Sequence, residues 1–136
     1  MMFGKANRPI RTAARLADLL YAHAEISNGP AGSLRVEVPF KGEKRSGEVF
    51  VRCAEVVGLG PVAHLTSPVV SEPTPELAER LAEKAGGWFV GDAVVADGAL
   101  CVRATLVLAE AKYSDVVVLM NSLAITADEL TNSLTT

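Results

Sequence analysis

Residues 48–70 read EVFVRCAEVVGLGPVAHLTSPVV, and this stretch decides the fold. In its first half, Val49 and Val51 alternate with Phe50, so the two sets of side chains point to opposite faces of an extended chain. The residues Gly-Leu-Gly-Pro at positions 58–61 are typical of a turn, and a second apolar run follows them. The stretch therefore predicts two strands joined by a turn, over residues 48–57 and 62–70.

Further strands are predicted on both sides of this pair. Residues 33–40, SLRVEVPF, alternate in the same way, and Asp97-Gly98 between two apolar runs is a strong hairpin signal. Pro68 has no amide donor, which predicts that its strand lies at a sheet edge near its end. The predicted strands are residues 34–40, 48–57, 62–70, 88–95 and 100–109.

Apolar residues recur at three- and four-residue spacing in three other segments, and this spacing predicts helices. Thr74 and Pro75 suit the start of the middle helix, because the hydroxyl caps the first turn and proline needs no amide partner there. The last helix carries an apolar stripe that we expect to pack against the sheet, at Leu119, Leu123, Ala127 and Leu130. The predicted helices are residues 10–26, 75–85 and 114–134.

The resulting order, α-β-β-β-α-β-β-α, predicts the α+β class. Strands and helices do not alternate in the way that a parallel sheet requires, so an antiparallel sheet with helices on one face is expected. A length of 136 residues suits a single domain, spanning residues 1–136. Half of the residues, 49%, are hydrophobic, which is enough to build a core without disulfides or metals.

Charge and hydropathy exclude several classes of function. The formal net charge is -3, whereas nucleic-acid binders usually carry a basic surface. No apolar stretch approaches the roughly 20 residues of a membrane span, and residues 1–20 lack the apolar core of a signal peptide. We therefore expect a cytoplasmic protein with no nucleic-acid partner and no membrane insertion.

Residues that could carry catalysis or hold a metal are few and scattered. His23 and His64 have no ligand or catalytic partner at a recognisable spacing, and His23 is expected at the core or rim of the first helix. Cys53 and Cys101 form no C-x-x-C pair and are expected as reduced thiols in apolar surroundings. No P-loop or G-x-S-x-G elbow occurs. We therefore predict no enzyme, no cofactor and no metal site.

The second face of the predicted sheet is more informative. Phe50, Arg52, His64 and Arg103 fall on this face, and they are the predicted partner-binding residues. One interpretation is an ordinary solvated sheet surface. The other is a peptide-docking surface, on which Phe50 supplies apolar contact and the arginines supply directional donors. The same face is predicted to hold Arg35, Glu37, Thr66 and Thr105.

Several stretches are similar to a known family. They read RSGEVFVR at residues 45–52, GGWFVGDAVVADGALCVRATLVLAE at residues 86–110 and LAITADELTNSL at residues 123–134. Together they resemble the YbjN family, whose fold is similar to that of the type III secretion chaperones. The resemblance extends over nearly the whole chain from the first helix onward. Arg103 matches an arginine in the second arm of the family's hairpin, and Ala127-Asp128 matches an Ala-Asp pair in its last helix.

The YbjN resemblance implies a chaperone-like domain that binds peptide segments, or a regulatory adaptor, without catalytic residues. A weaker likeness, through ELAERLAEKAGG at residues 76–87, is to roadblock-type dimerisation domains. The three strands before the middle helix fit the YbjN family better. A stand-alone cytoplasmic YbjN-like protein is therefore expected.

Two hypotheses about function follow. The first is a binding module that holds a segment of a protein partner, which a shallow apolar groove or an open strand edge would favour. The alternative is a small enzyme or small-molecule binder, which a deep pocket with clustered titratable residues would favour. A homodimer is also predicted, because Trp88 and Phe89 are adjacent and would place large aromatic groups on both faces of a strand.

Overall fold

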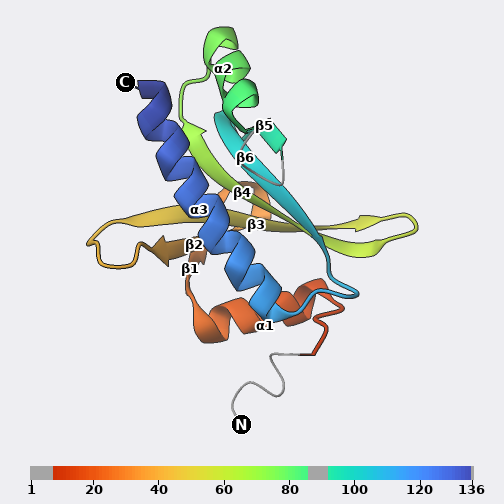
Figure 1. The fold of residues 1–136 in the computed structure, drawn as a ribbon. Coiled ribbons are helices and arrows are strands. Elements are labelled where there is room, and N and C mark those ends of the chain that lie inside the picture. The colour runs from red at the N-terminus through yellow and green to blue at the C-terminus, as the bar shows by residue number, and fades with distance from the viewer. Residues whose placement is uncertain (1–7, 86–91, 136) are drawn as a thin grey trace.

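The computed structural model describes residues 8–85 and 92–135, and within them an antiparallel sheet of six strands lies under three helices (Figure 1). The strands lie side by side in the order β1-β2-β3-β4-β6-β5. Their bounds are β1 Glu25–Asn28, β2 Leu34–Pro39, β3 Ser46–Val56, β4 Gly60–Val70, β5 Asp92–Ala96 and β6 Ala99–Val107. The helices are α1 Ala13–His23, α2 Pro75–Ala85 and α3 Tyr113–Thr135, and a short 3-10 turn, η1 Pro30–Gly32, joins β1 to β2.

The predicted α+β class is confirmed, with one additional strand. The helix predicted over residues 10–26 ends at His23, and Glu25–Asn28 form β1 instead. Ile26 fits the helical spacing, but it also pairs with Val36 of β2. That pairing satisfies the backbone of β1 and places Ile26 against the core, so the order becomes α-β-β-β-β-α-β-β-α.

The remaining boundaries lie close to their predicted positions. Helix α2 begins at Pro75, and the Thr74 hydroxyl accepts a hydrogen bond from the Leu77 amide at 3.2 Å, as a capping residue does. The predicted strand over residues 88–95 is described only from Asp92 onward. Its earlier residues, including Trp88 and Phe89, lie outside the described residues, as does the Gly86-Gly87 helix end.

The prediction that Pro68 marks an edge strand is wrong. Its strand, β4, lies between β3 and β6 in the interior of the sheet. Pro68 faces Cys101, and the register shifts between Pro68 and Val70. Such an irregularity accommodates a residue without an amide donor, because the ladder of hydrogen bonds is already interrupted there.

The helices pack on one face of the sheet, which we call the covered face. Helix α3 crosses the sheet, with α1 near its N-terminal end and α2 near its C-terminal end (Figure 1). The predicted stripe of α3 is buried at Leu123, Ala127 and Leu130, in one cluster with Val49 and Leu65 of the strands. Burial of each such leucine or valine contributes about 1.5–3 kcal/mol, so packing on the covered face stabilises the fold.

Candidate functional site

The predicted partner-binding residues lie together on the opposite face of β3, β4 and β6. In one row across these strands, Phe50 faces Thr66, which faces Arg103. In the next row, Arg52 faces His64, and His64 in turn faces Thr105. The six residues of the two rows define what we call the open face: Phe50, Arg52, His64, Thr66, Arg103 and Thr105.

Alternation along each strand separates the open face from the helices. The buried helix residues pack in one cluster with Val49, Val51, Leu65 and Val102 of the strands. These strand residues alternate in sequence with the open-face residues, so they point to the other side of the sheet. No open-face residue belongs to that cluster of described residues. The open face is not uniform, since Val62 and Cys101 on the same side of the sheet are buried.

Most of the polar groups on this side are already held by neighbours. Arg103 donates from Nε and Nη2 to the Asp92 carboxylate, at 3.2 and 2.7 Å. His64 Nδ1 and Thr105 Oγ1 lie 2.9 Å apart in a hydrogen bond. Arg35, which faces Phe50 from β2, forms an ion pair with Glu48. These pairs orient the side chains, and within residues 8–85 and 92–135 both Nη atoms of Arg35 and Nη1 of Arg103 make no hydrogen bond.

Like Arg35, of which only Nε makes a hydrogen bond among the described residues, Arg52 uses one of its three guanidinium nitrogens. Its Nη2 donates to the Pro30 carbonyl at 3.2 Å and lies 3.3 Å from Asp97 Oδ2. Within residues 8–85 and 92–135, its Nε and Nη1 make no hydrogen bond, and its side chain is 43% exposed. Arg52 therefore keeps N–H donors at Nε and Nη1 that can reach acceptors from outside the chain.

The contact between Arg52 and Asp97 also shows that the sheet curls toward the open face. Asp97 lies in the turn between β5 and β6, and β4 separates those strands from β3. Arg52 lies in register with Thr105 of β6 through His64, and Thr105 is eight residues from Asp97, or about 26 Å along a flat strand. The turn must therefore bend over the face to reach Arg52, which makes the face concave.

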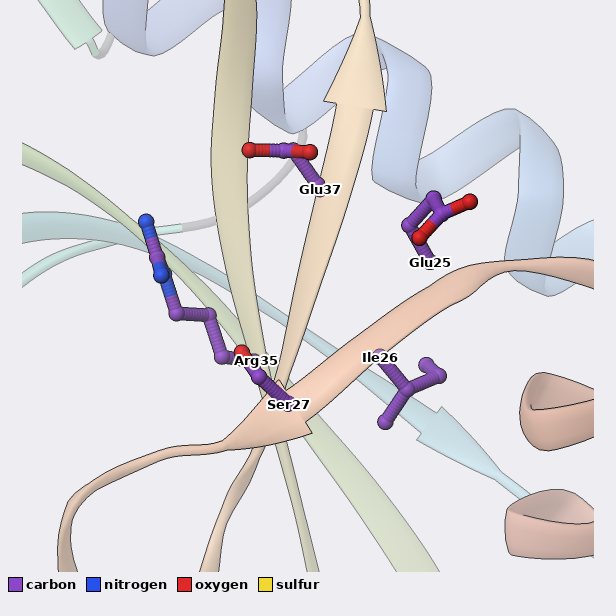
Figure 2. A pocket seen from close by; sticks show the side chains of 5 residues that line it. All are labelled: Glu25, Ile26, Ser27, Arg35 and Glu37. Carbon is purple, nitrogen blue, oxygen red and sulfur yellow. The ribbon is translucent and has the colours of Figure 1, made fainter.

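Three carboxylates lie between the open face and the β1 edge of the sheet, on the same side of the sheet as the open face. Glu25 faces Glu37 across β1 and β2, and Glu37 faces Glu48 across β2 and β3, so three like charges form a row. Arg35 neutralises Glu48, whereas Glu25 and Glu37 form no ion pair within the described part of the chain. Both line a small hollow of about 210 Å³ (Figure 2). The β1 edge of the sheet is therefore acidic on the side of the open face.

A second hollow lies on the other side of the sheet, between α1, η1 and β3, and we call it the α1 groove. Its volume is about 520 Å³. Tyr21, Arg52 and Cys53 supply its titratable groups, and no hydrogen bond joins them among the described residues. Burial raises the pKa of the Cys53 thiol, so the protonated form is favoured at neutral pH. Its other lining residues are Ala13, Leu16, Ala17, Leu20, Ala31, Gly32, Leu34 and Val51.

Sequence reasoning missed several parts of these surfaces. Asp92 and Asp97 are partners of open-face arginines, and the Asp97-Gly98 hairpin signal already placed Asp92 within reach of its neighbouring strand. The contact of Asp97 with Arg52 leaves no such signal, because it depends on the curl of the sheet. His23, expected at the core or rim, is exposed, and its ring packs beside Tyr113 with centroids 5.5 Å apart.

The Ala-Asp pair quoted for the YbjN resemblance is structural here. Ala127 is buried in the core, and the Asp128 carboxylate accepts hydrogen bonds at 2.8 and 3.1 Å from Arg45 in the loop between β2 and β3. Hydrogen bonds from Arg45 to Asp128 and Glu43 raise the pKa of the Arg45 guanidinium. The pair therefore ties this loop to α3.

No protein-family model matches the chain, and no curated protein is similar to it. The YbjN resemblance therefore rests on the quoted motifs. Across residues 8–85 and 92–135, no helix is long and apolar enough to cross a membrane. In the same residues, no group of three or more His, Cys, Asp or Glu side chains is placed to hold a metal ion.

Proposed function

We propose that this protein is a non-enzymatic, cytoplasmic binding module, chaperone-like or a regulatory adaptor, that holds an extended peptide segment of a partner protein on its open face. The observation that carries the proposal is the placement of Arg52, with unused donors at Nε and Nη1, beside the partly exposed Phe50 on a face that lies opposite the helices. A planar guanidinium with free donors and an aromatic ring are the groups most often found at the centre of protein interfaces.

The chemistry of the face selects the peptide. Arg52, Phe50 and Glu48 are alternate residues of β3, so their side chains follow one another at about 7 Å along the strand. The row of Glu48 continues into Glu37, whose carboxylate has no ion pair among the described residues. An extended peptide has the same spacing between alternate side chains. The matching segment carries a carboxylate, an apolar side chain and a cationic side chain at every second position.

The alternative, a small enzyme or small-molecule binder, has less support. The α1 groove offers mainly apolar contact, and its titratable groups form no acid–base pair among the described residues. General acid–base or nucleophilic catalysis needs such groups within hydrogen-bond distance of one another. A groove of this kind fits an apolar side chain better than a reacting substrate.

A pair of synthetic peptides tests the proposal. The first has the pattern acid-x-apolar-x-base, and the second has the same composition with both charged residues adjacent to the apolar one. In an extended chain, adjacent side chains point to opposite faces, so only the first peptide presents all three groups together. Fluorescence polarisation should show binding of the first peptide and at least about tenfold weaker binding of the second.

Three variants locate the site. Arg52→Ala and Phe50→Ala should each weaken binding of the first peptide by at least about tenfold, as loss of a central contact does. Arg80→Ala removes an exposed arginine of α2 and should leave binding unchanged. Thermal unfolding of each variant checks that the fold persists. Equal binding of both peptides, or equal binding by the wild type and the Arg52→Ala variant, would contradict the proposal.

A further inference from the structure

The turn between β3 and β4 carries an apolar tip. Val56, Val57 and Leu59 are 37%, 104% and 50% exposed, and they lie within four consecutive residues. The hairpin projects beyond the helices, at the right of the view (Figure 1). Single exposed aliphatic residues are common, whereas several together at the end of a projection mark a surface that another molecule covers. We call these three residues the hairpin tip.

The α1 groove of the same chain is largely apolar, as the hairpin tip is. It is lined largely by small and apolar residues, among them Ala13, Ala17 and Ala31, and its large exposed side chains are Tyr21 and Arg52. Its volume of about 520 Å³ is enough for several aliphatic side chains. Its floor includes Val51 and Cys53, which belong to the strand that leads to the hairpin tip.

A hairpin tip cannot enter the groove of its own chain. Cys53 in the groove and Val57 at the tip are separated by four residues of extended chain, or about 13 Å. The hairpin runs away from the groove, and the paired residues Val56 and Gly60 hold its two arms together up to the turn. Only the groove of another molecule is accessible to the tip.

We propose that two copies of this chain form a symmetric dimer in which the hairpin tip of each copy inserts into the α1 groove of the other. Because the groove and the tip lie on the same strand, one two-fold axis lets both insertions occur at once, and the pair closes. A tip that met a distant pocket would instead produce an open chain of subunits. Six aliphatic side chains, three from each copy, would be covered in this way.

The native thiol of Cys53 offers a direct test of this contact. A Val57→Cys variant places a second thiol on the hairpin tip, and diamide as added oxidant should then join it to Cys53 of the other copy. A disulfide within one chain is excluded, because it requires Cα atoms within about 7 Å. Cys101 is 3% exposed and protected from the reagent. A covalent dimer on a non-reducing gel, mapped by mass spectrometry to Cys53, is the expected result.

Two controls accompany the cross-link. Adding Cys53→Ser to the Val57→Cys variant should abolish the covalent dimer, since a dimer that persists would join two tips and overturn the proposal. Ser46→Cys places an exposed thiol at the other end of β3 and should give no cross-link to Cys53. Failure of the Val57→Cys variant to form a dimer at micromolar concentration would also overturn the proposal.

Sedimentation velocity gives a second measurement without cysteine chemistry. The wild-type chain should sediment as a dimer at micromolar concentration, and Val57→Glu should weaken the dimer by at least about tenfold. Val118→Glu changes a valine of α3 that is 63% exposed and should leave the dimer intact. A wild-type mass of 14.3 kDa at every concentration, or dissociation by Val118→Glu instead, would refute the proposed interface.

Arg52 lines the α1 groove as well as the open face, so the dimer proposal and peptide binding are separated at Val57 and not at Arg52. Val57 lies in the turn and not among the open-face residues, so the Val57→Glu variant should bind the acid-x-apolar-x-base peptide as the wild type does. Peptide binding without a dimer would remove only the dimer proposal. A dimer without peptide binding would remove only the proposed function.

Discussion

The two faces of the sheet are made by the same strands and differ in how their side chains are held. On the covered face, Val49 and Leu65 are fully buried under the helices, and close packing of aliphatic groups fixes them. On the open face, the neighbouring Phe50 and Thr66 are partly exposed, and hydrogen bonds to nearby groups orient the arginines. Alternation along one strand therefore separates a face that packs the core from a face that stays partly exposed, and substitutions on the two faces should have different consequences.

The largest expected difference is between adjacent residues of β4. Leu65→Ala should lower the free energy of unfolding by about 2–5 kcal/mol, because it leaves a cavity under the helices. Thr66→Ala, on the open face, should change it by less than about 1 kcal/mol. Urea denaturation of both variants measures the contrast. Similar losses in the two variants would show that the faces do not differ in this way.

The closeness of α3 to the covered face predicts an effect of intermediate size. A Cβ at Gly47 would lie 2.9 Å from the Cβ of Ala124 in α3 and 3.0 Å from the ring of Phe40. Because the Ala124 Cβ moves only with its helix, Gly47→Ala should cost about 1–3 kcal/mol of unfolding free energy. The exposed neighbour Ser46 serves as the control, and Ser46→Ala should have little effect. An unchanged urea midpoint for Gly47→Ala would mean that α3 has room to move.

The smallest expected effect concerns pH. Burial raises the pKa of the Cys53 and Cys101 thiols and of the Tyr113 phenol. Above about pH 8.5, where an ordinary thiol ionises, the unfolded chain releases protons that the folded chain keeps. The free energy of unfolding should therefore fall as the pH rises through this range, and the loss should continue up to the raised pKa values.

The two thiols lie on opposite sides of the sheet, so their contributions to the pH dependence can be compared. Cys53 packs against the core, and Cys101 lies on the side of the open face. Cys101 is the more deeply buried, at 3% exposure. Cys101→Ala should therefore reduce the slope of stability against alkaline pH more than Cys53→Ala does. Urea denaturation at several pH values tests the order, and a larger change in the Cys53→Ala variant would contradict it.

Local patterns were sufficient to predict most elements and the grouping of the open-face residues. Period-two alternation places Phe50 and Arg52 on one face of β3, and the same rule applies to His64 and Arg103 on their own strands. The bounds of α2 follow from Thr74 and Pro75, whose effects act within one turn. These predictions succeeded because they depend on interactions between residues close together in the sequence.

Tertiary structure alone decided the features that join distant segments. Ile26 fits a helix by spacing, but pairing with β2 makes its segment a strand, and a register shift allows Pro68 into the interior of the sheet. The contact of Arg52 with Asp97 depends on the strand order and on the curl of the sheet, and the α1 groove depends on where α1 docks. The sequence by itself determined which side chains share a face of each strand, because alternation is a property of the extended chain. Which faces are covered, and which guanidinium nitrogens of the arginines find partners, was decided only when the strands and helices packed together.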